Sequence, residues 1–292
     1  MIPCMNEFKK IVWLASYPKS GNTWFRVFLS NLLTHSNHPA NINNLYATPI
    51  ASNRELFDEA TGISSSELTL DEIDILRPLV YKFYAQKSEE ILYQKVHDAW
   101  ILNNEGKAIF PSEVTKGVIY FVRNPLDVAV SFSHHLGKSN EEVVKFLADS
   151  SYSFGSNQSR FHLQIRQQLL TWSEHIRSWV DESRLPILVI RYEDMKTNTF
   201  ETFKKTVEFL ELSASSDDIR KAINFSDIKE LQKQEADQGF KEKPTKATSF
   251  FRKGIVGSWR SELTSKQIHQ ICHDHKEMMI RFGYLDKQGR PI

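Results

Sequence analysis

Cysteine is rare in this chain of 292 residues, which contains only Cys4 and Cys272. Two cysteines are too few for the disulfide framework of a secreted scaffold, and these two do not form a Cys-x-x-Cys pair. The sequence also lacks an apolar stretch of about 20 residues that could span a membrane, and its first residues have no run long enough for a signal peptide. We therefore expect a soluble, unprocessed protein of the reducing cytoplasm with no membrane partner.

The chain also lacks an excess of charge of either sign, because its 37 lysines and arginines are balanced by 36 aspartates and glutamates. Non-specific binding of nucleic acid needs a broad basic field, so the balance argues against nucleic acid as a partner. Any anion-binding site must therefore be local. Hydrophobic residues make up 40% of the chain, which is enough for a sizeable core, and the length suits one domain over residues 1–292.

Short β-branched or aromatic runs alternate with longer helical patterns along the chain. The runs predicted to form strands are residues 11–16, 91–96, 118–122 and 187–191. The patterns predicted to form helices are residues 22–33, 69–88, 126–136, 140–148, 159–182, 199–211, 217–224 and 265–282. Because this alternation is typical of βαβ units, we expect an α/β fold with a central parallel sheet flanked by helices.

A polar stretch at residues 236–248 has the sequence ADQGFKEKPTKAT. Its glycine, its proline and its clustered charges are typical of a mobile loop. Since a further motif comes directly after it, we expect residues 236–257 to form a lid.

The first predicted strand runs directly into SYPKSGNTW at residues 16–24, after which an apolar helix begins. A strand, a short loop and a helix N-terminus together favour an anion, because free N–H groups and the helix dipole point at the loop. Lys19 adds a positive charge, and hydrogen-bonding side chains follow at Ser20, Asn22 and Thr23. The order differs from the G-x-x-x-x-G-K-[ST] loop of nucleotide triphosphatases, because Lys19 precedes Gly21. The alternative, a helix merely capped after a buried strand, leaves the Pro-Lys-Ser-Gly run without a reason.

SYPKSGNTW resembles the 5′-phosphosulfate loop of the cytosolic sulfotransferase family, and three further segments follow in that family's order. YFVRNPLDVAVS at 120–131 resembles the 3′-phosphate element, in which an arginine at a strand end and a serine eight residues later hold the phosphate. FRKGIVGSWR at 251–260 resembles the C-terminal RKGxxGDWK signature, and YEDM at 192–195 resembles the tyrosine segment that reaches adenine. The motifs span residues 11–260.

The resemblance implies a P-loop nucleotide-kinase-like sulfotransferase fold. It also implies transfer of a sulfuryl group from 3′-phosphoadenosine 5′-phosphosulfate (PAPS) to a hydroxyl or amine of a small-molecule acceptor, such as a secondary metabolite. The product is adenosine 3′,5′-bisphosphate (PAP), and the family's reaction uses no metal. The donor-binding residues that the resemblance implies are Lys19, Ser20, Gly21, Asn22, Thr23, Trp24, Arg123, Ser131, Tyr192, Arg252, Lys253 and Gly254.

Two of these assignments have plainer alternatives. Arg123 could instead form a surface ion pair with Asp127 at i,i+4. Trp24, which in the family stacks on adenine, could instead be a core residue. The partner on the other face of the adenine is either Phe225 or Ile228.

His97 follows the predicted strand at 91–96, within the sequence QKVHD at 94–98. The carboxyl ends of parallel strands meet at one sheet edge, so His97 should lie at the same edge as Lys19. Lys95 and His97 resemble the family's Lys-x-His element, which implies His97 as the general base and Lys95 and Lys19 as charges that hold the transferring oxygens. Where the family has Lys-Thr-His-Leu-Pro, this chain has Asp98 after the histidine, which could orient a water or bind a cationic acceptor. A strand end without chemistry is the alternative for His97.

The other histidines leave several hypotheses open. His134 and His135 could line the acceptor pocket or sit at a helix end, whereas His175 and Trp179 are expected in the core. A zinc site is conceivable near the C-terminus, but two of its four residues point away from the face that the others share. Those four residues are His269, Cys272, His273 and His275.

The C-terminal signature departs from the family pattern in two places. Ser258 stands where aspartate is usual, which could weaken a loop contact. The animal-type dimer contact is also expected to be absent, because the stretch at 263–266 reads LTSK and His269 replaces the family's acid.

Two rival functions remain. A nucleotide-dependent kinase is disfavoured by the missing triphosphate-loop glycines, and an inactive PAPS-binding protein would be expected to have lost Lys19 or His97. The segments that should form the acceptor pocket, residues 37–92 and 136–161, match no pattern that identifies the acceptor.

Overall fold

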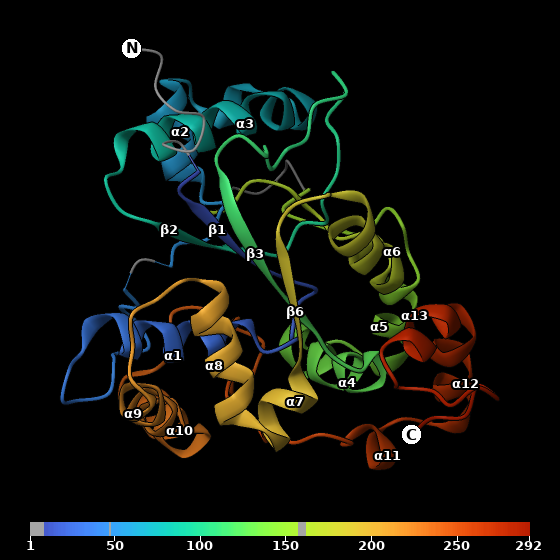
Figure 1. Cartoon of the computed structure of the whole chain (residues 1–292). Helices are drawn as coiled ribbons and strands as arrows, with labels where there is room; N and C mark the ends of the chain where they lie inside the picture. The colour runs from blue at the N-terminus through green and yellow to red at the C-terminus, as the bar shows by residue number, and fades with distance from the viewer. Residues whose placement is uncertain (1–8, 47, 157–161) are drawn as a thin grey trace. The chain divides into compact units, whose positions relative to one another are not determined.

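A computed structural model describes residues 9–46, 48–156 and 162–292. Among these residues, four strands form one sheet in the order β2-β1-β3-β6 (Figure 1). The strands are β1 (Ile11–Ser16), β2 (Leu92–Val96), β3 (Thr115–Val122) and β6 (Ile187–Arg191). β1 and β2 pair in parallel, with Ile11 opposite Leu92. The predicted α/β fold with a central parallel sheet is confirmed.

The described residues fall into two compact units. Unit 1 takes its described residues from Met1–Tyr17, Ala47–Tyr120 and Ser150–Val189, and unit 2 consists of Pro18–Tyr46, Phe121–Asp149 and Ile190–Ile292. The chain passes from unit 1 to unit 2 directly after β1 and within the last residues of β3 and β6. In a parallel sheet, these carboxyl ends are where ligand-binding loops begin.

Unit 1 has an aromatic core, in which Trp13 meets Tyr81 and Phe110 at centroid distances of 5.0 Å each. The predicted helix at 69–88 is α3, and it is bounded by a capping box between Thr69 and Glu72. The other regular elements of unit 1 are α2 (Arg54–Thr61), η1 (Ser65–Glu67), α3 (Leu70–Lys87), the antiparallel pair β4 (Ser153–Phe154) and β5 (Gln167–Gln168), α6 (Trp172–Arg177) and the π-helical η2 (Ser178–Glu182).

The long helix predicted at 159–182 is wrong. Its first three residues lie outside the described residues, and the short strand β5 lies within its predicted range. Leu170 has a φ of 59°, a left-handed value that a helix cannot pass through. The helix begins only at Trp172. The side chain of the N-cap Thr171 accepts a hydrogen bond from Glu174 N, and the side chain of Glu174 accepts one from Thr171 N.

Unit 2 is helical around the ends of β3 and β6. Its core contains the buried side chains of Val27, Ile42, Leu231, Phe240 and Phe251. Its helices are α1 (Asn22–Thr34), α4 (Pro125–Leu136), α5 (Asn140–Leu147), α7 (Tyr192–Thr197), α8 (Thr199–Phe209), α9 (Ser216–Phe225), α10 (Ile228–Gln238), α11 (Trp259–Glu262), α12 (Ser265–Asp274) and α13 (Lys276–Arg281).

Two predictions about unit 2 need correction. The single helix predicted at 265–282 is two helices, because His275 leaves helical geometry at φ −117° and both ends α12 and begins α13. The polar stretch expected to begin at residue 236 is helical as far as Gln238, and Gly239, at φ 71°, then ends α10. Residues 239–258 contain no helix or strand.

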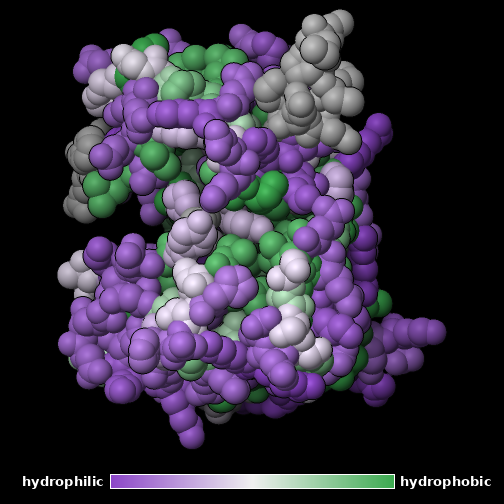
Figure 2. Space-filling view, turned by 60° about the vertical axis from the view of Figure 1, so that its left-hand side comes forward, coloured by the Kyte–Doolittle hydropathy of each residue, from purple (hydrophilic) through white to green (hydrophobic). Residues whose placement is uncertain are grey.

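The surface drawn in Figure 2 is mostly hydrophilic, and hydrophobic side chains are visible there in patches. In the described ranges, no helix combines the length and the apolar character that crossing a bilayer requires.

Candidate functional site

The loop after β1 leads into a helix end that lacks a side-chain cap. Gly21 is the N-cap of α1, no side chain accepts a hydrogen bond there, and the first turn contains no acidic residue. This contradicts the alternative of a helix that is merely capped after a buried strand. A helix N-terminus without a side-chain cap or an acidic first turn is a position that favours an anion.

Gly21 is required for two physical reasons. Its φ of 101° is a conformation that side chains disfavour. A Cβ at this position would also lie 2.8 Å from Cδ2 of Tyr192. The tyrosine predicted to reach adenine therefore packs directly against the loop.

Lys19 contacts two side chains that the sequence did not connect to it. Its Nζ lies 3.4 Å from His135 Nδ1 and 4.1 Å from the centroid of the Phe250 ring. The rings of His135 and Phe250 are themselves nearly perpendicular at a centroid distance of 5.7 Å. His135, in the last turn of α4, therefore contacts the loop after β1, and whether it lines an acceptor pocket stays a prediction.

Arg123, at the end of β3, joins the phosphate loop to the C-terminal signature. Its guanidinium donates to Lys19 O at 3.0 Å and to Ile255 O at 3.2 Å. It also lies 4.2 Å from the ring centroid of Tyr192, a cation–π distance. Among the described residues, its buried Nε has no hydrogen-bond partner.

The alternative that Arg123 pairs with Asp127 is wrong. Asp127 is fully buried and accepts three hydrogen bonds from the signature segment: from Gly257 N at 2.7 Å, from Ser258 Oγ at 3.0 Å and from Trp259 N at 3.1 Å. No pattern in the sequence indicated this anchoring role. Ser258, which replaces the family's aspartate, keeps a contact here as a hydroxyl donor to Asp127.

Arg252 and Lys253 are both paired with one acid that was not predicted, Glu262. The carboxylate lies 3.1 Å from Arg252 Nη1, 3.0 Å from Lys253 Nζ and 2.8 Å from His134 Nε2. Burial alone would raise the pKa of Glu262, but the hydrogen bonds from His134, Lys253 and Arg252 lower it to about 2. The two cations predicted to bind phosphate thus share one internal carboxylate.

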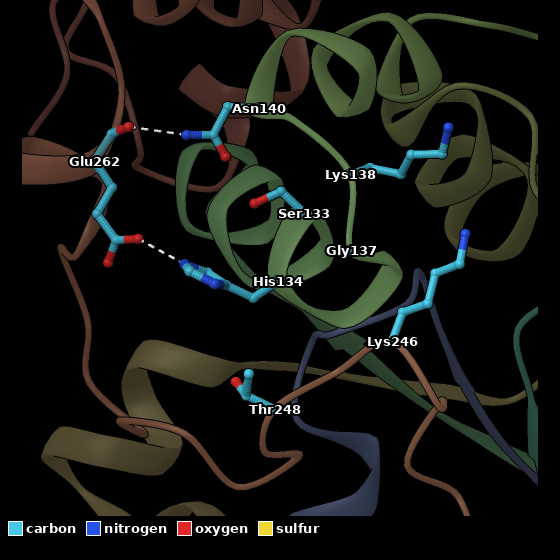
Figure 3. Close-up of a pocket in the computed structure, with 8 residues that line it drawn as sticks. All are labelled: Ser133, His134, Gly137, Lys138, Asn140, Lys246, Thr248 and Glu262. Carbon is cyan, nitrogen blue, oxygen red and sulfur yellow. Dashed lines mark hydrogen bonds and ion pairs between the residues drawn. The ribbon is translucent and has the colours of Figure 1, made fainter.

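This cluster borders a polar pocket of about 450 Å³ (Figure 3). Asn140, at the start of α5, also holds Glu262, because its side-chain amide donates a hydrogen bond to the main-chain oxygen of Glu262 at 2.8 Å. His134, in the last turn of α4, therefore belongs to the Glu262 cluster, and whether it also lines an acceptor pocket stays a prediction. The pocket is lined by Ser133, His134, Gly137, Lys138, Asn140, Lys246, Thr248 and Glu262.

The remaining predicted donor residues also lie in unit 2. Ser131 is partly buried on α4, and Gly254, at φ 58°, lies where a Cβ would come within 3.1 Å of Ile228. Trp24 and Ile228 pack against the same apolar cluster. Phe225 instead has Lys221 over its ring at 5.8 Å. The structure therefore groups Ile228 with Trp24.

His97 lies in unit 1, directly after β2. Its Nδ1 is 3.0 Å from Ser16 O and 3.3 Å from Ser16 Oγ. A main-chain oxygen only accepts, so Nδ1 carries the hydrogen and Nε2 of the neutral ring carries the lone pair. Lys95 lies in β2 and is buried to 9% exposure. That these two residues act together with Lys19 stays a prediction.

Asp98 forms a buried ion pair. Its carboxylate lies 2.7 Å from Arg77 Nη1, and both side chains are 1% exposed. An internal guanidinium thus occupies one carboxylate oxygen of Asp98, which disfavours a cationic acceptor there. The other oxygen, Oδ2, has no hydrogen-bond partner among the described residues, so the hypothesis that Asp98 orients a water stays a prediction. Arg166 and Asp74 extend the buried network.

The histidines near the C-terminus show no metal geometry. The rings of His269 and His273 stack at 6.5 Å, while Cys272 and His275 are buried. In the part of the chain that the structure describes, no three histidine, cysteine or acidic side chains gather as a metal site.

Comparison with known proteins gives one family. A model of the sulfotransferase domain matches residues 9–283. Rat Sulfotransferase 2A6 is 31% identical over 180 residues, or 60% of this chain and 60% of that protein. Mouse Sulfotransferase 1B1 is 24% identical over 91% of this chain and 81% of that protein, and the flavonol 3-sulfotransferase of Flaveria bidentis is 25% identical over 89% and 78%.

Solved structures of two proteins share the fold. Mouse sulfotransferase SULT7A1, complexed with PAP, gives a TM-score of 0.57 at 23% identity and covers 93% of this chain and 84% of that one. Retinol dehydratase, in complex with androsterone and the inactive cofactor PAP, gives 0.61 at 17% identity, with 93% and 81% coverage.

Proposed function

The chain belongs to the sulfotransferase family, and from that premise we propose that it transfers the sulfuryl group of PAPS to a hydroxyl or amine of a small-molecule acceptor. The observation that supports this best is the double contact of Arg123 with Lys19 O and Ile255 O. One guanidinium ties together the loop expected to bind the 5′-phosphosulfate and the signature expected to bind the 3′-phosphate. A ligand with two separate anionic groups suits this arrangement.

Buried polar atoms around the loop support the fit of such a donor. Ser20 Oγ, Trp24 Nε1 and Arg123 Nε are buried and have no hydrogen-bond partner among the described residues. Buried polar groups are nearly always satisfied, so each of these atoms needs a partner from outside the chain. A nucleotide that carries phosphates and a base provides polar atoms of the required kinds.

Each side chain has a defined role in the proposed reaction. His97 takes the proton of the acceptor at Nε2, because its Nδ1–H is held by Ser16 O. Lys19, Lys95 and the first amides of α1 stabilise negative charge on the transferring oxygens. Transfer is a direct in-line displacement at sulfur, and no residue becomes covalently modified.

The proposal is tested by incubating the protein with PAPS labelled in its sulfuryl group and a library of hydroxyl and amine acceptors. Label on an acceptor, with release of PAP, supports it. The same library with ATP labelled in its γ-phosphate tests the kinase alternative. Binding of PAP without transfer to any acceptor would indicate a binding protein and overturn the proposed activity.

A further inference from the structure

Side chains from one helical turn of unit 1, residues 175–179, form hydrogen bonds with the main chain around His97. His175 Nε2 lies 3.0 Å from His97 O, and Trp179 Nε1 donates to Asp98 O at 2.9 Å. Between these two side chains, Ser178 Oγ accepts from Trp100 N at 3.0 Å. Three side chains from the junction of α6 and η2 thus bond to three of the four residues 97–100.

The hydrogens on His175 can be assigned from its partners. A main-chain oxygen can only accept, so Nε2 carries the hydrogen and donates to His97 O. Nδ1 therefore accepts from the hydroxyl of Tyr120, which lies 2.7 Å away. Burial lowers the pKa of His175 to about 4 and raises the pKa of Tyr120 well above its ordinary value. Both groups are thus neutral near pH 7, in agreement with this assignment.

Packing restricts the imidazole further. His175 is fully buried, and its ring centroid lies 5.5 Å from the ring of Tyr17 and 5.7 Å from that of Tyr120. Ser178 and Trp179 lie in the π-helical turn η2, a conformation that is rare and is found mainly at functional sites. Apolar side chains would fill this part of the core equally well and would leave no buried polar atom in need of a hydrogen bond. Packing alone therefore does not explain a histidine and a serine at these positions.

We propose that His175 and Trp179 are positioning residues for the catalytic histidine. They fix the carbonyls of His97 and Asp98, while Ser16 O fixes the ring of His97 at Nδ1. The main chain and the imidazole are then both held, so the lone pair on Nε2 keeps one direction. This inference rests on the proposed function, in which His97 is the general base. A misplacement of about 1 Å at a reacting group can cost roughly a hundredfold in rate.

The sharpest test compares two tryptophans. Trp179→Phe removes the N–H that binds Asp98 O and keeps an aromatic ring. Trp13→Phe is the matched control, because Trp13 is equally buried and donates to Thr115 Oγ1 at 2.8 Å, away from residues 97–100. Both changes should lower the thermal midpoint by similar amounts. Only Trp179→Phe should lower kcat, by roughly tenfold to a hundredfold, with KM for PAPS and affinity for PAP unchanged.

A second pair separates the two nitrogens of His175. Glutamine places an amide N–H near the position of Nε2, whereas asparagine reaches only the position of Nδ1. We expect His175→Gln to retain most of kcat and His175→Asn to lose it. Ser178→Ala, which removes only a hydroxyl, provides a variant that should fold and should reduce kcat mildly.

The outcomes distinguish this inference from the proposed function. If the unmodified protein transfers sulfuryl groups and Trp179→Phe keeps the kcat of Trp13→Phe, the positioning role is wrong and the activity stands. Equal kcat in His175→Gln and His175→Asn would also overturn it. If the unmodified protein transfers no label, the proposed function fails first, and the hydrogen bonds around residues 97–100 have only a structural role.

Discussion

Glu262 accepts from Arg252 at 3.1 Å, in the segment that is expected to close over the 3′-phosphate. Lys253 donates to the same carboxylate oxygen at 3.0 Å. A bound phosphate would compete with this carboxylate for both cations. If Arg252 and Lys253 bind the 3′-phosphate, Glu262 should therefore weaken the binding of the donor.

The first prediction is that Glu262→Gln binds PAP more tightly than the unmodified protein. Arg252 and Glu262 are 25% and 20% exposed and Lys253 is 49% exposed, so solvent screens the pairs and the gain should be modest, about threefold to tenfold. Titration calorimetry with PAP at low and moderate salt measures it. Glu142→Gln is the control, because Glu142 has a pKa lowered to about 2 by Lys138 and Ser139 and pairs away from the signature. Equal or weaker binding by Glu262→Gln contradicts the competition.

The second prediction is that PAP binds much more tightly than AMP. The 3′-phosphate of PAP would contact the proposed anion site of Arg123, Ser131, Arg252 and Lys253, whereas AMP has no group to place there. Only PAP would then gain charge-assisted hydrogen bonds from these cations in place of their pairing with Glu262. Arg252→Ala should reduce the difference in affinity between PAP and AMP, mainly by weakening the binding of PAP. Calorimetry with both nucleotides decides, and equal affinities would refute a site with two phosphate positions.

The third prediction concerns the general base. His97→Ala should lower turnover by roughly two to four orders of magnitude, with affinity for PAP little changed. His273→Ala is the control, because its side chain is 76% exposed and its ring partners are Asp274 and His269. Single-turnover measurements at saturating PAPS are the readout. A rate near that of the unmodified protein would show that His97 is not the base.

The fourth prediction is a loss of stability in acid that depends on His175. Burial lowers its pKa to about 4, below the ordinary value of 6.5. The unfolded chain therefore binds a proton at this side chain at a higher pH than the folded protein, and stability falls as the pH falls from 6.5 toward 4. One fully coupled histidine contributes about 3 kcal/mol across that window. Urea denaturation at pH 7, 6, 5 and 4 should show a smaller decline for His175→Gln, and parallel curves would contradict the prediction.

Much of the fold could be predicted because local patterns determine it. β1 and β6 have the predicted bounds, and α3 begins one residue after the predicted start at residue 69. The donor residues carried by the motifs all lie in unit 2, and Arg123 ends its strand as expected. These features depend on short stretches of sequence whose backbone geometry is largely self-determined.

The missed contacts join residues that are far apart in the chain. The alternative pairing of Arg123 with Asp127 rests on their i,i+4 spacing, whereas the hydrogen-bond donors to Asp127 lie about 130 residues away. The pairing of Lys19 with His135 likewise depends on how α4 packs beside the loop. No local pattern encodes these distances, so tertiary structure was needed to find them.

The last prediction concerns the segment between α10 and α11. Phe240 and Phe251 are buried in the core of unit 2, whereas the residues between them are mostly polar. Residues 241–249 of this segment contain no helix or strand, and Glu242 pairs with Arg26 at 2.7 Å. With so little apolar surface to bury, they should exchange their amide hydrogens readily, while the two phenylalanines hold the ends in place.

PAP should slow that exchange. When Arg252 and Lys253 exchange Glu262 for a phosphate, two charge-assisted contacts at the C-terminal end of the segment offset part of its ordering entropy. Phe250 already covers Lys19 at 4.1 Å, so an ordered segment would also keep water away from the site of transfer. Hydrogen exchange of residues 241–249 with and without PAP is the measurement, and α12 (Ser265–Asp274) provides the internal reference. Unchanged protection in the segment would show a fixed loop and not a lid. Because Glu262→Gln removes the competing carboxylate, protection in that variant should reach its maximum at a lower concentration of PAP.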